Sequence, residues 1–343
     1  MLIVADDLTG AADTAGVFAT AGHRCVVVLD RSAPTFLPNS TVVALDTDTR
    51  AMSETDAFDV TAAVVKSYPG RSLYIKIDST VRGHIRATVL AAVSALRGLG
   101  EEPARVVVCP AFPALGRTVV GGNALLDREP LPAGDLQAVL ADVALTTHLI
   151  VPDAESDADL ARLVQTLHDP LRPSDTLWVG SAGLARHLAD HITPQDTGPT
   201  ETTSTVATVN IDASGELSRV HRPVAERVVV VVGSQHDRAE GQVARLRADT
   251  RVARIDPREP GHIEEILPVL READGLVLTG GHTAHAVLEA LGISRFAVSG
   301  EVITGMPWST AVSGGRLISI VTKAGAFGDE MALRRAVEFL EQP

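Results

Sequence analysis

The stretch that decides the fold is MLIVADDLTGAADTAGVFATAGHRCVVVL, residues 1–29. Its apolar runs Leu2–Ala5 and Cys25–Leu29 are short and continuous, which is typical of buried strands. Between them, the Ala-rich stretch Ala11–Thr20 predicts a helix. A strand, a helix and a second strand in this order predict a βαβ unit, and therefore a parallel sheet.

The same alternation continues outward along the chain. Further buried strands are predicted at Val42–Leu45, Leu73–Ile77, Val106–Cys109, Leu149–Val151, Leu177–Val179, Val228–Val232 and Gly275–Leu278. Helices are predicted at Thr55–Val65, Ile85–Leu96, Asp157–His168, Ala239–Arg247, Thr283–Leu291 and Asp329–Leu340. Strands that alternate with helices of this length indicate an α/β fold.

A change of composition divides the chain. Thr193–Thr208 reads TPQDTGPTETTSTVAT, which is polar, rich in Thr and Pro, and without a helical period. Such a segment is typical of a linker or an exposed crossover. We therefore predict a first domain at 1–192, a linker or crossover at 193–226 and a second domain at 227–343. The expected fold has two lobes, each a largely parallel sheet flanked by helices.

Composition argues against several classes of protein. The 343 residues are enough for two domains with full cores, and aromatic residues are only 3%, so Ala, Val and Leu must fill those cores. The net charge is -13 and there is no run of Lys and Arg, which is unfavourable for nucleic-acid binding. The chain also lacks the basic amphipathic face of a membrane-surface protein.

The termini and the cysteines indicate the cytoplasm. The N-terminus has no basic region and reaches acidic residues at once, so we expect no signal peptide, and no apolar run approaches the ~20 residues that span a bilayer. Cys25 and Cys109 lie in apolar surroundings and are expected to be buried and reduced. No paired Cys and His spacing suggests zinc.

The first candidate site is ADDLTGAADTAG, residues 5–16. Asp6 and Asp7 follow a predicted strand, and in open α/β sheets ligands bind beyond the carboxyl ends of the strands. Neighbouring residues of an extended chain point in opposite directions, so we expect only one of the two carboxylates to face a ligand. The alternative is that one Asp caps the following helix, which we give about half the weight.

The second candidate is YIKIDSTVRGHI, residues 74–85. A strand delivers Lys76, Asp78, Ser79 and Arg82 within seven residues. Two cations, a carboxylate and a hydroxyl suit a polyhydroxy acid, because the planar Arg fork matches a carboxylate. The alternative is a surface ion-pair cluster, which is common and contributes little stability.

The third candidate is CPAFPALGRTVVGGNALLD, residues 109–127, in which a Pro-rich loop presents Arg117 directly after a strand. A rigid loop that presents one Arg suits anion binding. An ordinary Pro-rich loop with a solvated Arg is an equally good interpretation of this segment alone.

The second half contains three glycine-rich turns at strand ends. They are VVVVVGSQ, ending near Ser234, LVLTGGHTAHAVLEALG, and KAGAFGD at Lys323–Asp329. Glycines before a helix let a phosphate approach backbone N–H groups at the positive end of the helix dipole. Three such turns indicate a nucleotide site. Neither a GxxxxGK[ST] loop nor a GxGxxG after the first strand is present, which counts against P-loop and Rossmann dehydrogenase readings.

Taken together, these segments resemble the four-carbon acid sugar kinase family. The matching stretches are ADDLTGAADTA, KIDSTVRG, PAFPALGRT, GSAGLA, VVGS, TGGHTAHAVLEALG, GEVITGMPWS and TKAGAFGDE, in the family's order and over nearly the whole chain. The resemblance implies an acid-sugar-binding first domain, a nucleotide-binding second domain and an active site in the cleft between them. It also implies ATP-dependent phosphorylation of threonate, erythronate or a 3-oxo-tetronate at the terminal hydroxyl.

The predicted site residues follow from these motifs. For the acid we predict Asp6, Asp7, Arg50, Lys76, Asp78, Ser79, Arg82 and Arg117. For ATP we predict Ser234, Thr279, Gly280, Gly281, His282, Thr283, Gly325 and Gly328. Asp7 or Asp78 would orient the hydroxyl and accept its proton, and Mg²⁺ would bridge the phosphates. Asp7 is the first candidate, because Asp78 has Lys76 and Arg82 nearby as ion partners.

Two other functions stay open from the sequence. One is a non-catalytic sugar-acid sensor that keeps the fold, and the other is a nicotinamide-dependent dehydrogenase of a small hydroxy acid. Turnover of ATP separates the kinase from both. The predicted partners are the small sugar acid and ATP, with no nucleic acid and no membrane, and a homodimer is left open.

Overall fold

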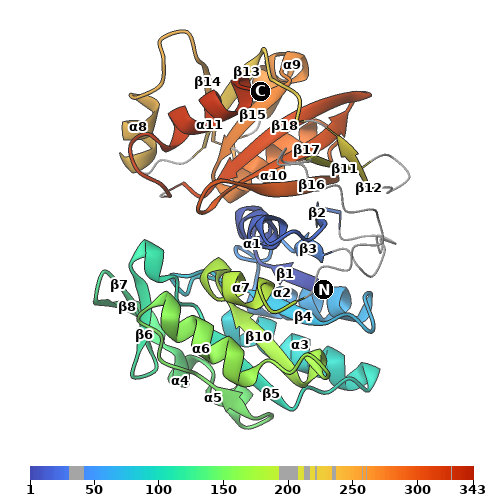
Figure 1. Ribbon diagram of the computed structural model, residues 1–343, viewed down its shortest axis with the longest axis vertical. Helices are drawn as coiled ribbons and strands as arrows, with labels where there is room; N and C mark the ends of the chain where they lie inside the picture. Colours follow the sequence, from blue (N-terminus) through green and yellow to red (C-terminus); the bar gives the residue numbers. More distant parts are fainter. Residues whose placement is uncertain are drawn as a thin grey trace. The chain divides into compact units, whose positions relative to one another are not determined.

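The computed structural model describes residues 1–30, 42–192, 208–211, 217–220, 222–233, 237–256, 258–259, 261–325 and 327–343 (Figure 1). The described chain divides into two compact units. Unit 1 contains Met1–Thr14 and residues 42–192, and unit 2 contains Ala15–Asp30 and the described residues from 208 onward.

Unit 1 is built on a sheet in which every neighbouring pair of strands is parallel. Its strand order is β3-β1-β4-β10-β5-β9. The strands are β1 (Leu2–Ala5), β3 (Val42–Asp46), β4 (Leu73–Lys76), β5 (Arg105–Cys109), β9 (Leu149–Ile150) and β10 (Thr176–Gly180). Their apolar runs are continuous because a parallel sheet is covered on both faces. The prediction of a largely parallel sheet is confirmed for this unit.

The helices of unit 1 pack in pairs beside this sheet. The α2 and α3 helices contact each other, as do α6 and α7, and in Figure 1 the α6–α7 pair lies in front of β10. Ser side chains cap the N-termini of α2, α6 and α7. The bounds are α1 (Leu8–Thr20, whose end belongs to unit 2), α2 (Glu54–Lys66), α3 (Ile85–Leu99), α4 (Leu136–Val139), α5 (Ala141–Ala144), α6 (Asp157–Leu167) and α7 (Ala182–Ala189).

The Pro-rich loop predicted before Arg117 is present, with a short 3-10 turn at Pro113–Leu115, and a small antiparallel sheet begins at Arg117. Its strands are β6 (Arg117–Val120), β7 (Asn123–Leu126) and β8 (Glu129–Asp135), in the order β6-β7-β8. Gly116 ends the 3-10 turn with a φ of +71°, directly before Arg117.

Unit 2 contains a mixed sheet of order β14-β13-β15-β18-β17-β16-β2. The first four strands pair in parallel, whereas β18, β17, β16 and β2 pair antiparallel, so "largely parallel" is wrong for this unit. The strands are β2 (Cys25–Val28), β13 (Val228–Val232), β14 (Arg251–Arg254), β15 (Gly275–Thr279), β16 (Arg295–Ile303), β17 (Met306–Ser313) and β18 (Arg316–Lys323). A separate two-stranded pair consists of β11 (Thr208–Ile211) and β12 (Leu217–Val220).

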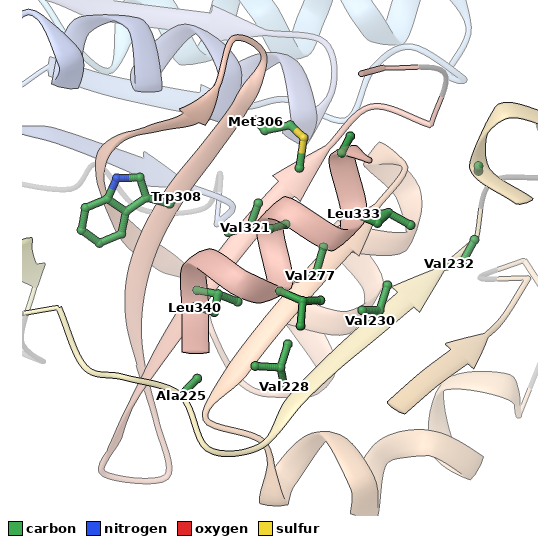
Figure 2. Packing of buried hydrophobic residues seen from close by; sticks show 14 residues of the cluster. Ala225, Val228, Val230, Val232, Val277, Met306, Trp308, Val321, Leu333 and Leu340 are labelled. Carbon is green, nitrogen blue, oxygen red and sulfur yellow. The ribbon is translucent and has the colours of Figure 1, made fainter. Parts of the chain in front are cut away.

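The core of unit 2 lies between this sheet and its last helix. Leu333 and Leu340 of α11 pack against Val230, Val277 and Val321 of the sheet (Figure 2). The helices are α8 (Asp237–Val243), α9 (His262–Glu272), α10 (Gly281–Ala290) and α11 (Ala332–Glu341). Small β-branched residues on the strands let this helix lie close, which fits a chain with few aromatic residues.

The boundaries of the units differ from the predicted domains at one place. The predicted first domain, 1–192, includes Ala15–Asp30, which the structure assigns to unit 2. The physical reason is that β2 pairs antiparallel with β16, with Val27 opposite Phe296. Residues 193–207 of the predicted linker lie outside the described residues. Within the described ranges, no helix is both long and apolar enough to cross a bilayer.

Candidate functional site

The residues that follow β1 form the centre of a charged cluster in unit 1. Arg50 Nε and Nη2 donate to the two oxygens of Asp6, over 2.8 and 2.7 Å, and Nη1 donates to Asp7 Oδ2 over 2.8 Å. Both carboxylates thus reach one guanidinium, and the prediction that they point in opposite directions is wrong. The reason is that the strand ends at Ala5, so the alternation of an extended chain does not reach Asp6 and Asp7.

Asp7 also caps helix α1. Its Oδ1 accepts the backbone N–H of Gly10 over 2.9 Å, and its Oδ2 accepts the hydroxyl of Thr9 over 2.8 Å. The capping interpretation of the Asp pair is therefore confirmed for Asp7. The same carboxylate pairs with Arg50, so capping and charge pairing hold it in one fixed orientation.

Asp78 organises the turn that follows β4. Arg82 donates from Nε to Oδ2 and from Nη2 to Oδ1, each over 2.8 Å, and the hydroxyl of Thr80 donates to Oδ2. The Arg82 side chain is 65% exposed while that of Asp78 is 11% exposed, so this is not the fully solvated ion pair of the alternative interpretation. Arg50 Nη2 also lies 3.9 Å from Asp78 Oδ1, which joins this turn to Asp6 and Asp7.

Gly83 closes the turn against Asp6. Its φ is +87°, and a Cβ at this position would lie 2.6 Å from Asp6 Oδ2. Val81 has a φ of +64°, which is strained for a β-branched residue. Such strain persists only where the surrounding structure holds the backbone, and it often occurs at functional sites.

Lys76 lies beside Asp7 rather than beside Asp78. A Cβ at Gly10 would be 2.6 Å from Asp7 Oδ1 and 2.9 Å from Lys76 Nζ, so both groups flank Gly10. Lys76 is buried, yet no carboxylate of the described residues lies within 4 Å of its ammonium group. This cation is therefore available to an anionic ligand.

The remaining acid-site predictions fall at the edge of this cluster. Burial lowers the pKa of Arg117, which also interacts electrostatically with Asp78 and Arg82. Ser79 is half-buried next to Asp78. Four cations, Arg50, Lys76, Arg82 and Arg117, are interleaved with the carboxylates of this cluster, and Asp13 and Asp127 also act on Arg117. Cations and carboxylates side by side suit a ligand that carries both a carboxylate and hydroxyls.

The three carboxyl groups differ in pKa. Burial raises the pKa of Asp6 more than its bonds with Arg50 lower it. Burial is the largest single influence on the pKa of Asp7 and Asp78 and opposes their ionisation. At Asp7 the charges of Arg50 and Lys76 and the hydrogen bonds from Thr9 and Gly10 together outweigh it, so the pKa is lowered. At Asp78 the hydrogen bonds and charge of Arg82, the charge of Arg50 and the hydroxyl of Thr80 do the same. Asp7 and Asp78 are thus anionic at neutral pH and can accept hydrogen bonds from ligand hydroxyls.

A cavity of about 500 Å³ lies behind the Arg82 turn. Its walls include Val81, Gly83 and His84, together with residues of α4 and α5. None of the predicted acid-binding side chains lines it. We therefore locate the candidate site at the charged cluster and not in this cavity.

In unit 2, two of the predicted glycine-rich turns come together at strand ends. Gly280, with a φ of +97°, precedes α10, and its N–H donates to the carbonyl of Lys323 over 2.9 Å. Gly233, which follows β13, lies against Thr283, because a Cβ added to Gly233 would lie 1.8 Å from Thr283 Oγ1. Thr279 is buried and its hydroxyl has no partner among the described residues.

The other predicted nucleotide residues differ in position. Gly281 is the first residue of α10, and His282 beside it is exposed. Gly325 and Gly328 are half-buried in the turn before α11. Ser234 lies outside the described residues.

Sequence reasoning missed Lys323 and Gln242, which hold the KAGAFGD turn from inside. Lys323 Nζ donates to the carbonyls of Ala324, Gly325 and Phe327 over 2.9, 2.9 and 3.0 Å. Gln242 Nε2 donates to the carbonyl of Phe327 over 2.8 Å. The available signal was a Lys at the end of an apolar strand, directly before the glycines.

Comparison with known families matches both halves of the chain. A family model described as a sugar-binding N-terminal domain matches residues 1–138, and one described as a nucleotide-binding C-terminal domain matches residues 262–333. The first covers the charged cluster, and the second covers both glycine-rich turns that Lys323 joins.

Known relatives align over the whole chain. A D-threonate kinase of Cupriavidus necator is 33% identical, with 98% of this chain and 96% of the relative covered. A D-threonate kinase of Bordetella bronchiseptica is 30% identical, with 99% and 97% covered. A solved structure from Haemophilus influenzae is 17% identical with a TM-score of 0.67, covering 99% of this chain and 100% of that one, which shows a shared fold.

Proposed function

The chain belongs to the four-carbon acid sugar kinase family, and from this membership we propose that it transfers the γ-phosphoryl group of ATP to a hydroxyl of a four-carbon sugar acid. The observation that carries the proposal is the cluster around Arg50, where three carboxylates lie beside several cations at the ends of β1 and β4. Cations bind the carboxylate of the substrate, and carboxylates bind its hydroxyls.

The acid-binding residues divide these roles. Lys76, Arg82 and Arg117 hold the carboxylate; Lys76 lies next to Asp7, with no ion pair within 4 Å among the described residues. Asp7 orients the hydroxyl that is phosphorylated and accepts its proton, with Asp78 as the second candidate. The low pKa values of both acids fit a loose transition state, in which positioning matters more than strong general-base catalysis.

The nucleotide-binding role falls to the glycine-rich turns of unit 2. The N-terminus of α10 offers free N–H groups after Gly280. The turn with Gly325 and Gly328 follows β18, the strand that pairs with β15. Phosphates bind such positions through backbone N–H groups and the helix dipole. Transfer requires the γ-phosphate and the substrate hydroxyl to meet during the reaction, so we place the active site between the acid and nucleotide sites.

Mg²⁺ fits this scheme as a companion of the nucleotide. Among the described residues no group of three or more His, Cys, Asp or Glu side chains is arranged to hold a metal ion. Mg²⁺ usually binds through substrate phosphates and one or two carboxylates, which needs no such group. When bound it neutralises charge on the phosphates, and Asp7 or Asp78 is the carboxylate that would assist.

The substrate we propose first is D-threonate, because both of the relatives described above are D-threonate kinases. Erythronate and 3-oxo-tetronates are the alternatives within the same chemistry. All of them present one carboxylate and several hydroxyls to the Arg50 cluster.

An ADP-release assay over a panel of four-carbon acids tests the function. We expect ADP release that depends on the acid, with the highest kcat/KM for D-threonate. A sensor would bind an acid in calorimetry without releasing ADP, and a dehydrogenase would change nicotinamide absorbance instead. Either result would overturn the kinase proposal.

A further inference from the structure

The ammonium group of Lys323 is buried without an acidic partner. Lys323 is the last residue of β18, and its side chain is 0% exposed. Its three hydrogen bonds all go to backbone carbonyls of the turn that follows, and no carboxylate of the described residues lies within 4 Å. Burying a charge is costly unless an opposite charge lies near it, so a buried ammonium group that has only carbonyl partners needs an explanation.

A second buried side chain holds the same turn. Gln242 of α8 is 0% exposed, and its Nε2 donates to the carbonyls of Phe327 and Asp329 over 2.8 Å each. Lys323 and Gln242 share the carbonyl of Phe327. Together they turn the carbonyls of this segment inward, toward cationic and amide donors.

Lys323 also connects this turn to the start of α10. Its own carbonyl accepts the N–H of Gly280, and Thr279 is its partner in the parallel pairing of β15 and β18. One residue therefore fixes both glycine-rich turns, one through its backbone and the other through its side chain. An anionic ligand above these turns would supply the negative charge that Lys323 lacks.

We propose that Lys323 is a positioning residue for the triphosphate, which orients the backbone at Ala324, Gly325 and Phe327 and gives the site its fixed positive charge. The inference rests on the proposed nucleotide role of unit 2 and extends it to a side chain outside the glycine motifs. A purely structural lysine would affect folding but would not affect ATP binding selectively.

The first test is calorimetric binding of the Mg²⁺ complex of a non-hydrolysable ATP analogue to full-length Lys323→Met. We expect the Kd to rise about 10- to 100-fold, because the variant loses the donor that shapes the turn and one positive charge near the phosphates. Binding of D-threonate should be unchanged. Thr322→Val is the matched control, since Thr322 is buried on the same strand and its hydroxyl has no partner among the described residues. An unchanged Kd in Lys323→Met would overturn the proposal.

The pH dependence of the wild type tests the same idea if Lys323→Met does not fold. Burial, followed by the charge of Arg238, lowers the pKa of Lys323 to about 8. The ammonium is therefore present below that pH and lost as the pH rises through it, so the Kd should increase between pH 7 and 9. A flat profile would count against the proposal.

Turnover separates this inference from the proposed function. If the wild type binds the nucleotide and releases no ADP with any acid, the kinase proposal fails and the role of Lys323 in binding is still measured. If the wild type is an active kinase and Lys323→Met binds the analogue normally, only the inference about Lys323 fails. A wild type that binds no nucleotide would overturn both.

Discussion

At the scale of single residues, the acid site depends on Arg50. Its guanidinium binds Asp6 through two hydrogen bonds and Asp7 through a third, while Asp78 lies 3.9 Å away. The three acids come from two strand ends, those of β1 and β4, and one side chain holds them at a common centre. Arg can do this because its fork offers several donors in one plane, which Lys does not.

Asp7→Asn tests which carboxylate accepts the proton. Asn is as good an N-cap as Asp, so helix α1 should persist. The amide cannot take a proton, and loss of a general base typically lowers the rate by ~10²–10⁴-fold. We expect kcat to fall by this amount while ATP still binds.

Asp78→Asn is the comparison for that experiment. Its main effect is expected on the KM for the acid, because Asp78 holds Arg82 in place. Steady-state kinetics of both variants, with circular dichroism as a check on folding, give the answer. A near-normal kcat in Asp7→Asn would move the base elsewhere, with Asp78 the first candidate.

At the scale of elements, the turn between β4 and α3 positions the acid site. Asp78 accepts hydrogen bonds within the turn, Val81 takes a left-handed conformation, and Gly83 lies against Asp6. The turn is thus fixed from three sides before any ligand binds. Preformed turns of this kind reduce the ordering cost of binding.

Gly83→Ala should disrupt acid binding specifically. The added Cβ would lie 2.6 Å from Asp6 Oδ2 and would push that carboxylate from Arg50. We expect the KM for the acid to rise roughly 10-fold or more, equivalent to about 1.4 kcal/mol, with little change in ATP affinity.

Gly70→Ala is the matched control. Gly70 belongs to the same unit and has a φ of +75°, but a Cβ there would have nothing within 4 Å. Both variants should lose a similar ~1–2 kcal/mol of stability from the left-handed backbone, measured by thermal unfolding. An equal change of acid KM in the two variants would mean that strain, and not the contact with Asp6, is responsible.

The start of α10 is the matching element on the nucleotide side. Gly281→Asp places a side chain and a negative charge where phosphate should bind, so ATP binding by calorimetry should be lost while the fold persists. Gly98→Asp in α3 adds the same charge in open space and should bind ATP normally. Unchanged ATP affinity in Gly281→Asp would remove α10 from the nucleotide site.

The sequence predicted elements well where burial is uniform. The all-valine strand Val228–Val232 is found with the same bounds, because a strand covered on both faces reads as one apolar run. The strands β14, β16, β17 and β18 were missed. In β16 and β17, Gly300 and Pro307 interrupt the pattern and bulges shift the register. The contact of both Asp6 and Asp7 with Arg50 was missed too. The prediction assumed that the extended strand continues through these residues, whereas β1 ends at Ala5.

At the scale of the whole molecule, the sequence order does not follow the units. Ala15–Asp30 lies near the N-terminus but belongs to unit 2, where β2 pairs antiparallel with β16. A division of the chain at one linker therefore cannot separate the two units cleanly.

A fragment of residues 1–192 should reveal this dependence. It would carry the fully buried strand β2, CVVV, without its partner β16. Unpaired apolar strand edges favour association, so we expect aggregates in size-exclusion chromatography where the full chain gives a single species. Val27→Lys should reduce the aggregation of the fragment. A monomeric fragment with native-like circular dichroism would show that β2 does not need β16.

The pairing of β2 with β16 also has a consequence for folding during synthesis, because the two strands are made at different times. Val28 is made about 270 residues before its partner Arg295. At the usual 5–20 residues per second, the three valines of β2 wait roughly 15 to 50 s for their partner strand. Unit 1 can complete its parallel sheet during that interval, whereas unit 2 cannot. The strand β2 therefore lacks its partner β16 until most of the chain has been made, and its apolar side chains are open to association during that interval.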